Sequence, residues 1–247
     1  MKRNEFIKIS GIAGLSLVIF PQFSFKSFSE KFTRNQLIGK GNPDIVGDSY
    51  TSKMHKSAKE AFHKMKIAAE KENINIEVVS AYRSFQRQKE IFEGKYKRFT
   101  NQGLLPEKAL EKIIEYSTIP GTSRHHWGTD IDIIDANAPR PANVLMPENF
   151  HGNGPFCKLK MWLNENAEKF NFYEVYTDNG NRKGFKYEPW HFSYAPISVP
   201  MLEEYKERIN VIEMLSEEKI LGNEHFSEEF VSKYVKENIF DINPKLL

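Results

Sequence analysis

Two histidines and three aspartates lie within residues 123–135, in the segment SRHHWGTDIDIID. Imidazoles and carboxylates are costly to bury together unless they pair with one another or bind a metal ion. The alternation in TDIDIID predicts a strand in which Asp130 and Asp132 share one face. His125 precedes this strand, and Gly128 permits a tight turn between them. One imidazole and one carboxylate can therefore point toward a common centre.

A second group of such residues lies in EPWHFSY, much later in the chain. In a regular strand Glu188 and His191 would face opposite sides, so we expect Pro189 to mark an irregular entry that turns Glu188 inward. Two imidazoles and a carboxylate are ligands typical of hydrolytic zinc sites, which keep a fourth position for a water whose pKa the ion lowers to ~7. A further carboxylate then accepts a proton from the attacking water. Such a set is supplied by His125, Asp132, His191 and Glu188.

These motifs resemble those of a known family. SRHHWGTDID is similar to the Ser-x-His-x-x-Gly-x-Ala-x-Asp signature of the VanY-like D-alanyl-D-alanine carboxypeptidases, zinc peptidases of the LAS group. EPWH resembles the Glu-x-x-His element of that family, and SAYRSFQRQ resembles its Tyr-Arg-Ser segment followed by Gln. The three motifs occur in the order found in the family, and the resemblance covers residues 37–196.

The resemblance implies a zinc-dependent D,D-carboxypeptidase that removes terminal D-alanine from peptidoglycan stem peptides. It assigns one zinc ion to His125, Asp132 and His191, and it assigns the role of general base to Glu188. It also implies that Arg83 steadies the carbonyl or the carboxylate of the substrate, a role that suits a forked, permanently charged donor.

Five further residues are expected around the substrate. The resemblance implies that Ser123 and Gln88 help to hold the peptide, and we expect Tyr82 and Trp190 to form pocket wall or core. Asp130 is a departure, because the signature has Ala at its position. We place Asp130 among the substrate-binding residues, with two other roles open: it could orient a neighbouring side chain or compete for the metal.

Alternatives stay open at the level of the residue and of the function. His126 is the alternative ligand to His125, and both His125 and His191 could instead be structural histidines satisfied by backbone groups. An endopeptidase or a D-Ala-D-Ala dipeptidase of the same zinc group would use the same residues. A binding module for cell-wall peptides would keep the fold without turnover.

The composition is that of an ordinary globular protein, with 40% hydrophobic and 28% charged residues and a formal net charge of +2. The small net charge gives no sign of a nucleic-acid partner, and no arginine-rich or lysine-rich block appears in the sequence, so we expect none. Cys157 is the only cysteine, which excludes an internal disulfide and a cysteine-rich zinc site. Any metal must therefore be bound through nitrogen and oxygen.

The first 29 residues have the pattern of an export signal. The basic start MKRNEFIK is followed by the apolar run ISGIAGLSLVIF, which is short for a membrane span. We expect an exported, periplasmic or extracellular protein associated with the cell envelope. Whether this segment is cleaved or stays as an anchor, it is the only part expected to contact a membrane.

The remaining pattern predicts an α+β fold, which the resemblance specifies as a small central antiparallel sheet flanked by helices. We expect residues 30–198 to form the catalytic domain and residues 199–247 a helical extension. Residues 30–50 look irregular. Helices are predicted for 52–73, 84–97, a stretch after Pro106, 156–170, a stretch after Pro200 and one capped by Ser227, and strands for 73–82, 129–135, 172–176 and 190–194.

Overall fold

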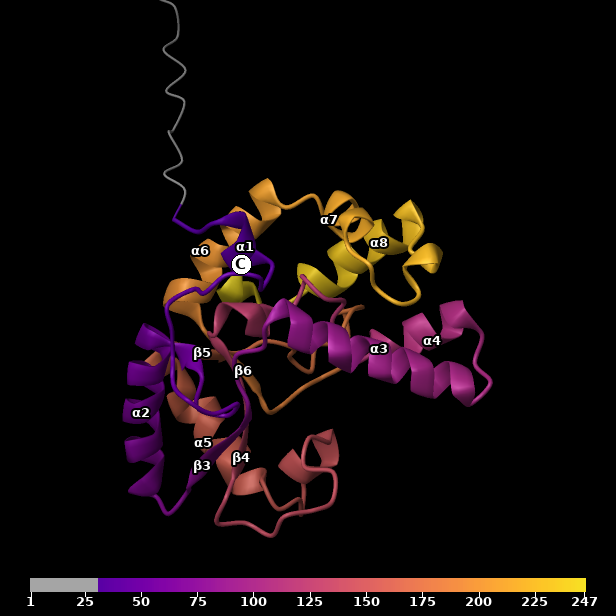
Figure 1. Cartoon of the computed structure of the whole chain (residues 1–247). Coiled ribbons are helices and arrows are strands. Elements are labelled where there is room, and N and C mark those ends of the chain that lie inside the picture. Colours follow the sequence, from indigo (N-terminus) through magenta and orange to yellow (C-terminus); the bar gives the residue numbers. More distant parts are fainter. Residues whose placement is uncertain (1–30) are drawn as a thin grey trace, which may run out of the picture. The chain divides into compact units, whose positions relative to one another are not determined.

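A four-stranded antiparallel sheet lies at the centre of the computed structural model, which describes residues 31–247. Its strands are neighbours in the order β3 (Ile76–Ser80), β4 (Asp130–Asp135), β6 (His191–Tyr194) and β5 (Phe172–Glu174). Helices α2 (Lys56–Glu70) and α5 (Cys157–Asn166) lie on one side of the sheet, and α3 (Phe85–Asn101) and α4 (Pro106–Ile113) lie on the other (Figure 1). The predicted fold class is confirmed.

The side of the sheet covered by α2 and α5 holds one of two hydrophobic cores. Met65 and Ala69 of α2 and Leu163 of α5 pack with Ile131 and Ile133 of β4, and all five are buried. The helical spacing of the apolar residues in α2 explains this face, because residues three and four apart lie on one side of a helix. This core fixes the position of β4, whose other face is turned toward the site.

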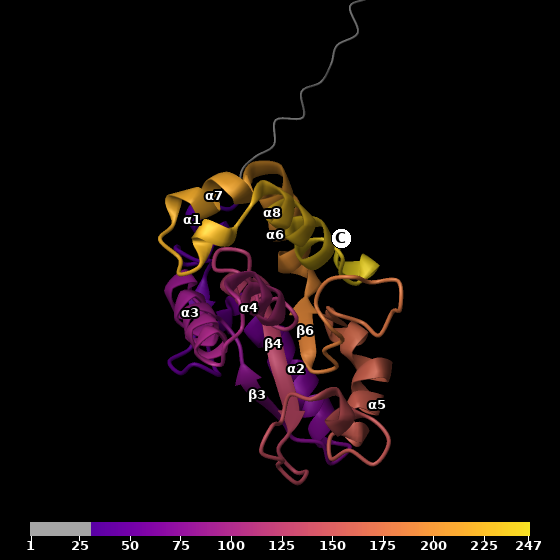
Figure 2. The same cartoon turned by 90° about the vertical axis from the view of Figure 1, so that its right-hand side faces the viewer.

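The helices α3 and α4 begin where their sequences predict. Ser84 caps α3 by accepting a hydrogen bond from the backbone N–H of Arg87, and Pro106 occupies the first turn of α4. Figures 1 and 2 both show these helices beneath the C-terminal helices. Phe85 and Phe92 of α3 belong to the second core, so this helix packs with the C-terminal part of the chain.

The register of β4 and β6 brings four polar side chains together. Asp130 lies opposite Ser193, and Asp132 lies opposite His191. Residues two apart on a strand share a face, so these four side chains form one patch on the same face of the sheet. All six residues of β4 are buried, which means that the carboxylates on this patch must find partners.

Residues 31–55 are more regular than predicted. They contain a short helix, α1 (Arg34–Leu37), and a two-stranded sheet in which β1 (Ile45–Val46) pairs with β2 (Met54–His55). Helix α2 consequently starts at Lys56, with His55 as its N-cap, and not at residue 52. The segment was read as irregular because two-residue strands are too short to show an alternating pattern.

The C-terminal helices begin earlier than predicted. Helix α6 (Ala195–Arg208) starts directly after β6 and continues through Pro200, so the boundary expected at residue 199 falls inside a helix. Helices α7 (Val211–Glu217) and α8 (Glu228–Tyr234) follow, and Ser227 caps α8 as predicted. The remaining helical turns are short: 3-10 turns at Arg124–Trp127, Pro147–Phe150, Ala167–Phe170, Asn223–His225 and Pro244–Leu246, and a π turn at Val235–Ile239.

These C-terminal helices share a core with α3 and α4. Met201 and Tyr205 of α6, Met214 of α7 and Tyr234 of α8 are buried in one cluster with Phe92 of α3. Residues 31–247 therefore form a single compact unit.

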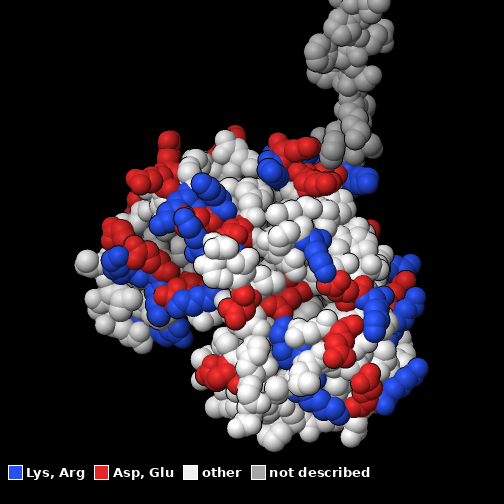
Figure 3. Space-filling view, turned by 180° about the vertical axis from the view of Figure 1, so that it is seen from behind, with Lys and Arg blue, Asp and Glu red and all other residues white. Residues whose placement is uncertain are grey.

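The surface of the molecule carries charges of both signs. On the face shown in Figure 3, acidic and basic side chains are interspersed.

Among residues 31–247, no helix has both the length and the apolar character needed to cross a membrane. The predicted export segment, residues 1–29, lies outside the described residues.

Candidate metal centre

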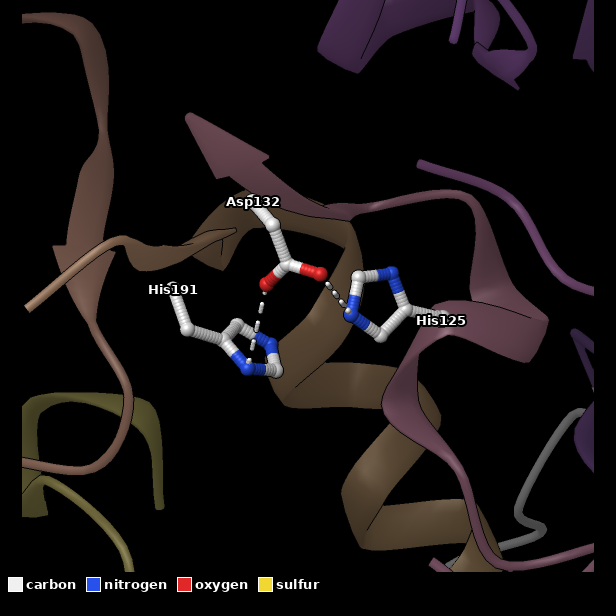
Figure 4. Close-up of side chains that lie close together, drawn as sticks. All are labelled: His125, Asp132 and His191. Atoms are coloured by element: carbon white, nitrogen blue, oxygen red, sulfur yellow. Dashed lines mark ion pairs between the residues drawn. The ribbon is translucent and has the colours of Figure 1, made fainter. Parts of the chain in front are cut away.

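His125, Asp132 and His191 converge on one point beside the sheet (Figure 4). Asp132 lies between the two imidazoles: its Oδ2 is 3.4 Å from Nε2 of His125, and its Oδ1 is 3.7 Å from Nδ1 of His191. The three residues are buried, and each offers a ligand atom within 4.8 Å of the other two. Gly128, at φ +69°, makes the turn between the helical turn that holds His125 and the strand that holds Asp132.

The arrangement fits a small divalent cation. A tetrahedral zinc ion with ligands at ~2.0–2.1 Å separates its ligand atoms by about 3.3 Å. The two pairs of atoms that include Asp132 are 3.4 and 3.7 Å apart. Nδ1–H of His125 donates to the carbonyl oxygen of Ala81 at 2.7 Å, which leaves Nε2 as the nitrogen that faces the cluster. Nε2 of His125 and Oδ1 of Asp132 are both buried without a hydrogen-bond partner, and a bound cation would satisfy both.

Glu188 lies beside this cluster. The backbone N–H of His191 donates to the carbonyl oxygen of Glu188 at 3.1 Å, which closes a turn around Pro189 and Trp190. This turn brings Oε2 of Glu188 to 2.9 Å from Nδ1 of His191, so the predicted irregular entry at Pro189 is confirmed. Burial raises the pKa of the Glu188 carboxyl, against the lowering effect of the hydrogen bond to His191. A carboxylate with a raised pKa is the better proton acceptor.

The site stabilises positive charge at its centre. Burial opposes ionisation of His191, but hydrogen bonds to Asp130 and Glu188 and the charge of Asp132 raise its pKa to about 10. Burial likewise opposes ionisation of Asp132, while His125, His191 and the more distant Arg83 lower its pKa to about 2. The carboxylates that stabilise a protonated imidazole would also stabilise a metal cation.

His126, the alternative ligand, points away from the cluster. Its Nδ1–H donates to the carbonyl oxygen of Arg83 at 2.6 Å, and its Nε2 accepts the backbone N–H of Gly121 at 3.1 Å. Both nitrogens are therefore in use, and burial lowers the pKa of His126 to about 3. His126 therefore has a structural role, because its two hydrogen bonds link two loops.

A cavity of about 660 Å³ opens onto the cluster. Glu188 and the three clustered residues line it, together with Arg83, Lys95 and Arg98. Arg83 lies with its Nη2 4.0 Å from Oδ2 of Asp132, and its buried Nε has no hydrogen-bond partner. Lys95 forms no hydrogen bond or ion pair within residues 31–247. Its pKa is lowered by burial and by the charges of Arg83 and Arg98, so an anion bound here would relieve this repulsion.

The residues expected around the substrate divide into two groups. Ser123 and Trp190 line the cavity, and Oγ of Ser123 is buried without a partner. Tyr82 is half-buried and is not among the lining residues. Gln88 is fully buried; it accepts from Nη1 of Arg83 at 2.9 Å and donates to the carbonyl oxygen of Thr118, so it positions Arg83.

Asp130 requires a correction. It is fully buried, does not line the cavity and belongs to no cluster of metal-ligating residues found in the described chain, so it has no surface that a substrate could contact. Nε2 of His191 lies 3.0 Å from its Oδ1. Of the three roles left open, only the orientation of a neighbour agrees with this position.

Three residues of the site were missed by the motifs: Arg124, Ser193 and Lys95. Arg124 and Ser193 both contact Asp130, and Ser193 could have been found because it follows His191 by two residues on the same strand face. Lys95 follows Gln88 by seven residues, which is two helical turns, so it lies on the same face of α3.

A buried cluster of two imidazoles and one carboxylate, with a second carboxylate beside it in an open cavity, is an arrangement typical of metal-dependent hydrolases. The family model VanY, described as D-alanyl-D-alanine carboxypeptidase, matches residues 51–197, more than half of the chain. The chain belongs to the VanY family of D-alanyl-D-alanine carboxypeptidases and is thus a metallopeptidase.

The chain is also similar to curated proteins of other bacteria. The chain is 34% identical over 93 residues to an uncharacterised protein of Haemophilus influenzae, with 37% of this chain and 71% of that protein covered. It is 29% identical over 143 residues to a D-alanyl-D-alanine carboxypeptidase of Enterococcus faecalis, with 58% of this chain covered. The matched region spans 48% of the Enterococcus protein, about half its length.

A solved structure shows that the fold is shared. It is described as VanYB in complex with D-alanine-D-alanine, and it matches with a TM-score of 0.52 and 23% sequence identity. The match covers 73% of this chain and 92% of the solved chain.

Proposed function

We propose that this protein is a zinc-dependent D,D-carboxypeptidase that hydrolyses the terminal D-alanyl-D-alanine bond of peptidoglycan stem peptides. The observation that carries the proposal is the position of Glu188, 2.9 Å from His191 and in the same cavity as His125 and Asp132. Turnover needs a proton acceptor beside the metal ligands, and a peptide-binding module would not.

The donor set supports zinc as the metal. His125, Asp132 and His191 supply two nitrogens and one oxygen, a three-ligand set of the kind found in catalytic zinc sites. One bound ion would supply the positive charge that polarises the scissile carbonyl and makes a water acidic near neutral pH. The family membership supports a substrate that ends in D-alanyl-D-alanine.

The residues of this chain then divide the remaining work. Glu188 accepts the proton of the attacking water and returns it to the nitrogen of the leaving D-alanine. Arg83 neutralises negative charge on the substrate, either on the terminal carboxylate or on the oxygen that becomes negative during attack. Gln88 holds the guanidinium of Arg83 in place for this role.

The charges of the cavity support removal of a terminal residue over cleavage within a chain. One cavity is lined by Arg83, Lys95 and Arg98. The guanidinium of Arg83 and the ammonium of Lys95 both have N–H donors without a hydrogen-bond partner in the described residues. A carboxypeptidase substrate brings a free carboxylate to such a place, and charge-assisted hydrogen bonds are the strong ones. An internal peptide bond brings no such charge.

The experiment compares wild type with Glu188→Gln on a stem pentapeptide ending in D-Ala-D-Ala and on the same peptide with a C-terminal amide. We expect wild type to release one D-alanine from the free acid and to act at least about tenfold more slowly on the amide. Glu188→Gln should lose turnover by at least about 100-fold while keeping its zinc content.

Mass spectrometry of the products separates the alternatives. Release of the intact D-Ala-D-Ala dipeptide would identify a dipeptide-releasing enzyme, and equal cleavage of the acid and the amide would identify an endopeptidase. A Glu188→Gln variant that hydrolyses the peptide at the wild-type rate would remove Glu188 as the base. The proposed substrate lies outside the cytoplasmic membrane, in agreement with the export signal expected in residues 1–29.

A further inference from the structure

The carboxylate of Asp130 lies behind His191, on the side away from Asp132. Nε2 of His191 is 3.0 Å from Oδ1 of Asp130, while Nδ1 of the same ring faces Glu188 and Asp132. The two ring nitrogens therefore have different neighbours. One faces the cavity, and the other faces a carboxylate that has no exposed surface.

Four donors hold the Asp130 carboxylate in one orientation. Oδ1 accepts from Nε of Arg124 at 3.0 Å in addition to His191. Oδ2 accepts from the hydroxyls of Thr129 and Ser193, each at 2.7 Å. Each oxygen thus accepts two hydrogen bonds, which uses the full capacity of an ionised carboxylate.

The donors themselves are tied together. Nη2 of Arg124 donates to Oγ of Ser193 at 2.7 Å, so the guanidinium binds both Asp130 and one of its partners. Arg124 also stacks over the ring of Trp127, 5.0 Å from its centroid. The members of this network are at most 4% exposed, so water does not compete for its hydrogen bonds. Two of its contacts follow from the register that pairs Asp130 with Ser193 and places His191 one diagonal away.

We propose that Asp130 is a positioning residue that accepts Nε2–H of His191 and so keeps Nδ1 as the nitrogen available to the metal. This inference rests on the proposed function, since it names a residue that supports the same site. A carboxylate that accepts the second N–H of a ligating histidine fixes the ring orientation and makes the ligand more basic. An Ala at residue 130 could not accept this N–H, so the network depends on the carboxylate of Asp130.

The test measures the zinc dissociation constant of wild type, Asp130→Asn and Asp135→Asn by competition with a chromophoric chelator. Asn keeps the size of Asp130 and removes its charge. We expect the dissociation constant of Asp130→Asn to rise about 10- to 100-fold, with kcat reduced and KM for the stem peptide unchanged.

Asp135→Asn is the matched control on the same strand. Asp135 is buried and accepts hydrogen bonds from the backbone of Asn75 and Asn137, each at 3.0 Å, without contacting the site. Its substitution should change stability but neither zinc affinity nor kcat. Equal loss of zinc affinity in both variants would overturn the proposal, because it would show a general effect of buried carboxylates on the fold.

A second measurement needs no substitution. A long-range proton–nitrogen NMR spectrum of the histidine rings in the zinc-loaded wild type should show His191 protonated at Nε2. Zinc bound to Nε2 would overturn the proposal, as would an Asp130→Asn variant with wild-type zinc affinity. Neither result would affect the proposed function. Wild type that binds no zinc would instead overturn the proposed function and this inference with it.

Discussion

Arg83 lines the cavity beside the metal cluster, and contacts of both its backbone and its side chain hold it in place. Its N–H donates to the carbonyl oxygen of His125 at 3.0 Å, and its own carbonyl oxygen accepts from His126. Nη1 is bound by Gln88, which leaves Nε without a partner and Nη2 at the edge of the metal cluster. A fork held in this way is prepared to bind a carboxylate or a developing oxyanion.

Substitution of Arg83 by Lys should therefore be severe although it keeps the charge. The Lys side chain cannot reproduce the fork that binds Gln88 on one side and the substrate on the other, so we expect kcat/KM to fall about 100-fold. Steady-state kinetics on the stem pentapeptide measures this. Arg87→Lys is the control, because Arg87 is exposed on α3, which begins two residues after Arg83, and within residues 31–247 its side chain pairs only with Glu90. Wild-type kinetics for Arg83→Lys would show that the guanidinium does not contact the substrate.

At the residue scale, the sequence motifs predicted His125, Asp132 and His191 as one candidate metal site, because each belongs to a short pattern with its own spacing. They left three roles open for Asp130 and did not decide among them. Its partners Ser193 and His191 are set by the register between β4 and β6, and register is a pairing of two segments that neither segment carries alone.

At the element scale, the loop around Gly39 supports the segment that holds the ligands. Gly39 has φ +81°, and its carbonyl oxygen accepts the backbone N–H of Phe85 at the start of α3. A Cβ atom at Gly39 would lie 2.5 Å from the ring of His126. Because His126 links Arg83 to Gly121, a shift of its ring would disturb both loops.

We expect Gly39→Ala to destabilise the protein by at least about 2 kcal/mol, since a left-handed backbone costs a non-glycine residue roughly 1–2 kcal/mol and the steric conflict adds to it. Gly103→Ala is the matched control: Gly103 has φ +89°, but nothing lies within 4 Å of an added Cβ. It should cost about 1 kcal/mol. Urea unfolding monitored by fluorescence compares the two. Equal urea midpoints for the two variants would mean that the close approach of His126 does not require glycine at residue 39.

Most helices and all four strands of the main sheet could be predicted from periodicity, because each has one apolar face. The start of α6 could not. Pro200 was read as a helix boundary, because a proline inside a helix lacks one N–H donor and its ring crowds the carbonyl of the preceding turn. The helix nevertheless continues through Pro200, and apolar residues on both sides of it pack into the core. Tertiary packing outweighed the local preference.

At the scale of the whole molecule, the C-terminal helices brace the metal centre from outside the motifs. The hydroxyl of Tyr234 in α8 accepts the backbone N–H of Ile119 at 3.0 Å and lies 2.7 Å from Oγ1 of Thr122. Tyr205 of α6 donates to the carbonyl oxygen of Gly121 at 2.9 Å. The loop that leads into the ligand segment is thus fastened to the tail, which the sequence could not reveal because these contacts join residues far apart in the chain.

Tyr234→Phe tests this bracing. It leaves the N–H of Ile119 buried without its partner, so we expect a loss of about 1–3 kcal/mol in the free energy of unfolding. Tyr173→Phe should have little effect, because the hydroxyl of Tyr173 makes no hydrogen bond within the described residues. Thermal unfolding of both variants provides the comparison. Unchanged stability of Tyr234→Phe would contradict a bracing role for α8.

His125, Asp132 and His191 are proposed to bind one zinc ion on which hydrolysis depends. The measurement that tests it most directly is a titration of metal-free protein with zinc, in which bound zinc and the release of D-alanine from the stem pentapeptide are followed in the same samples. We predict that both rise together and level off at one zinc ion per chain. Full activity in the metal-free protein, or zinc binding that leaves the rate of D-alanine release unchanged, would contradict the account.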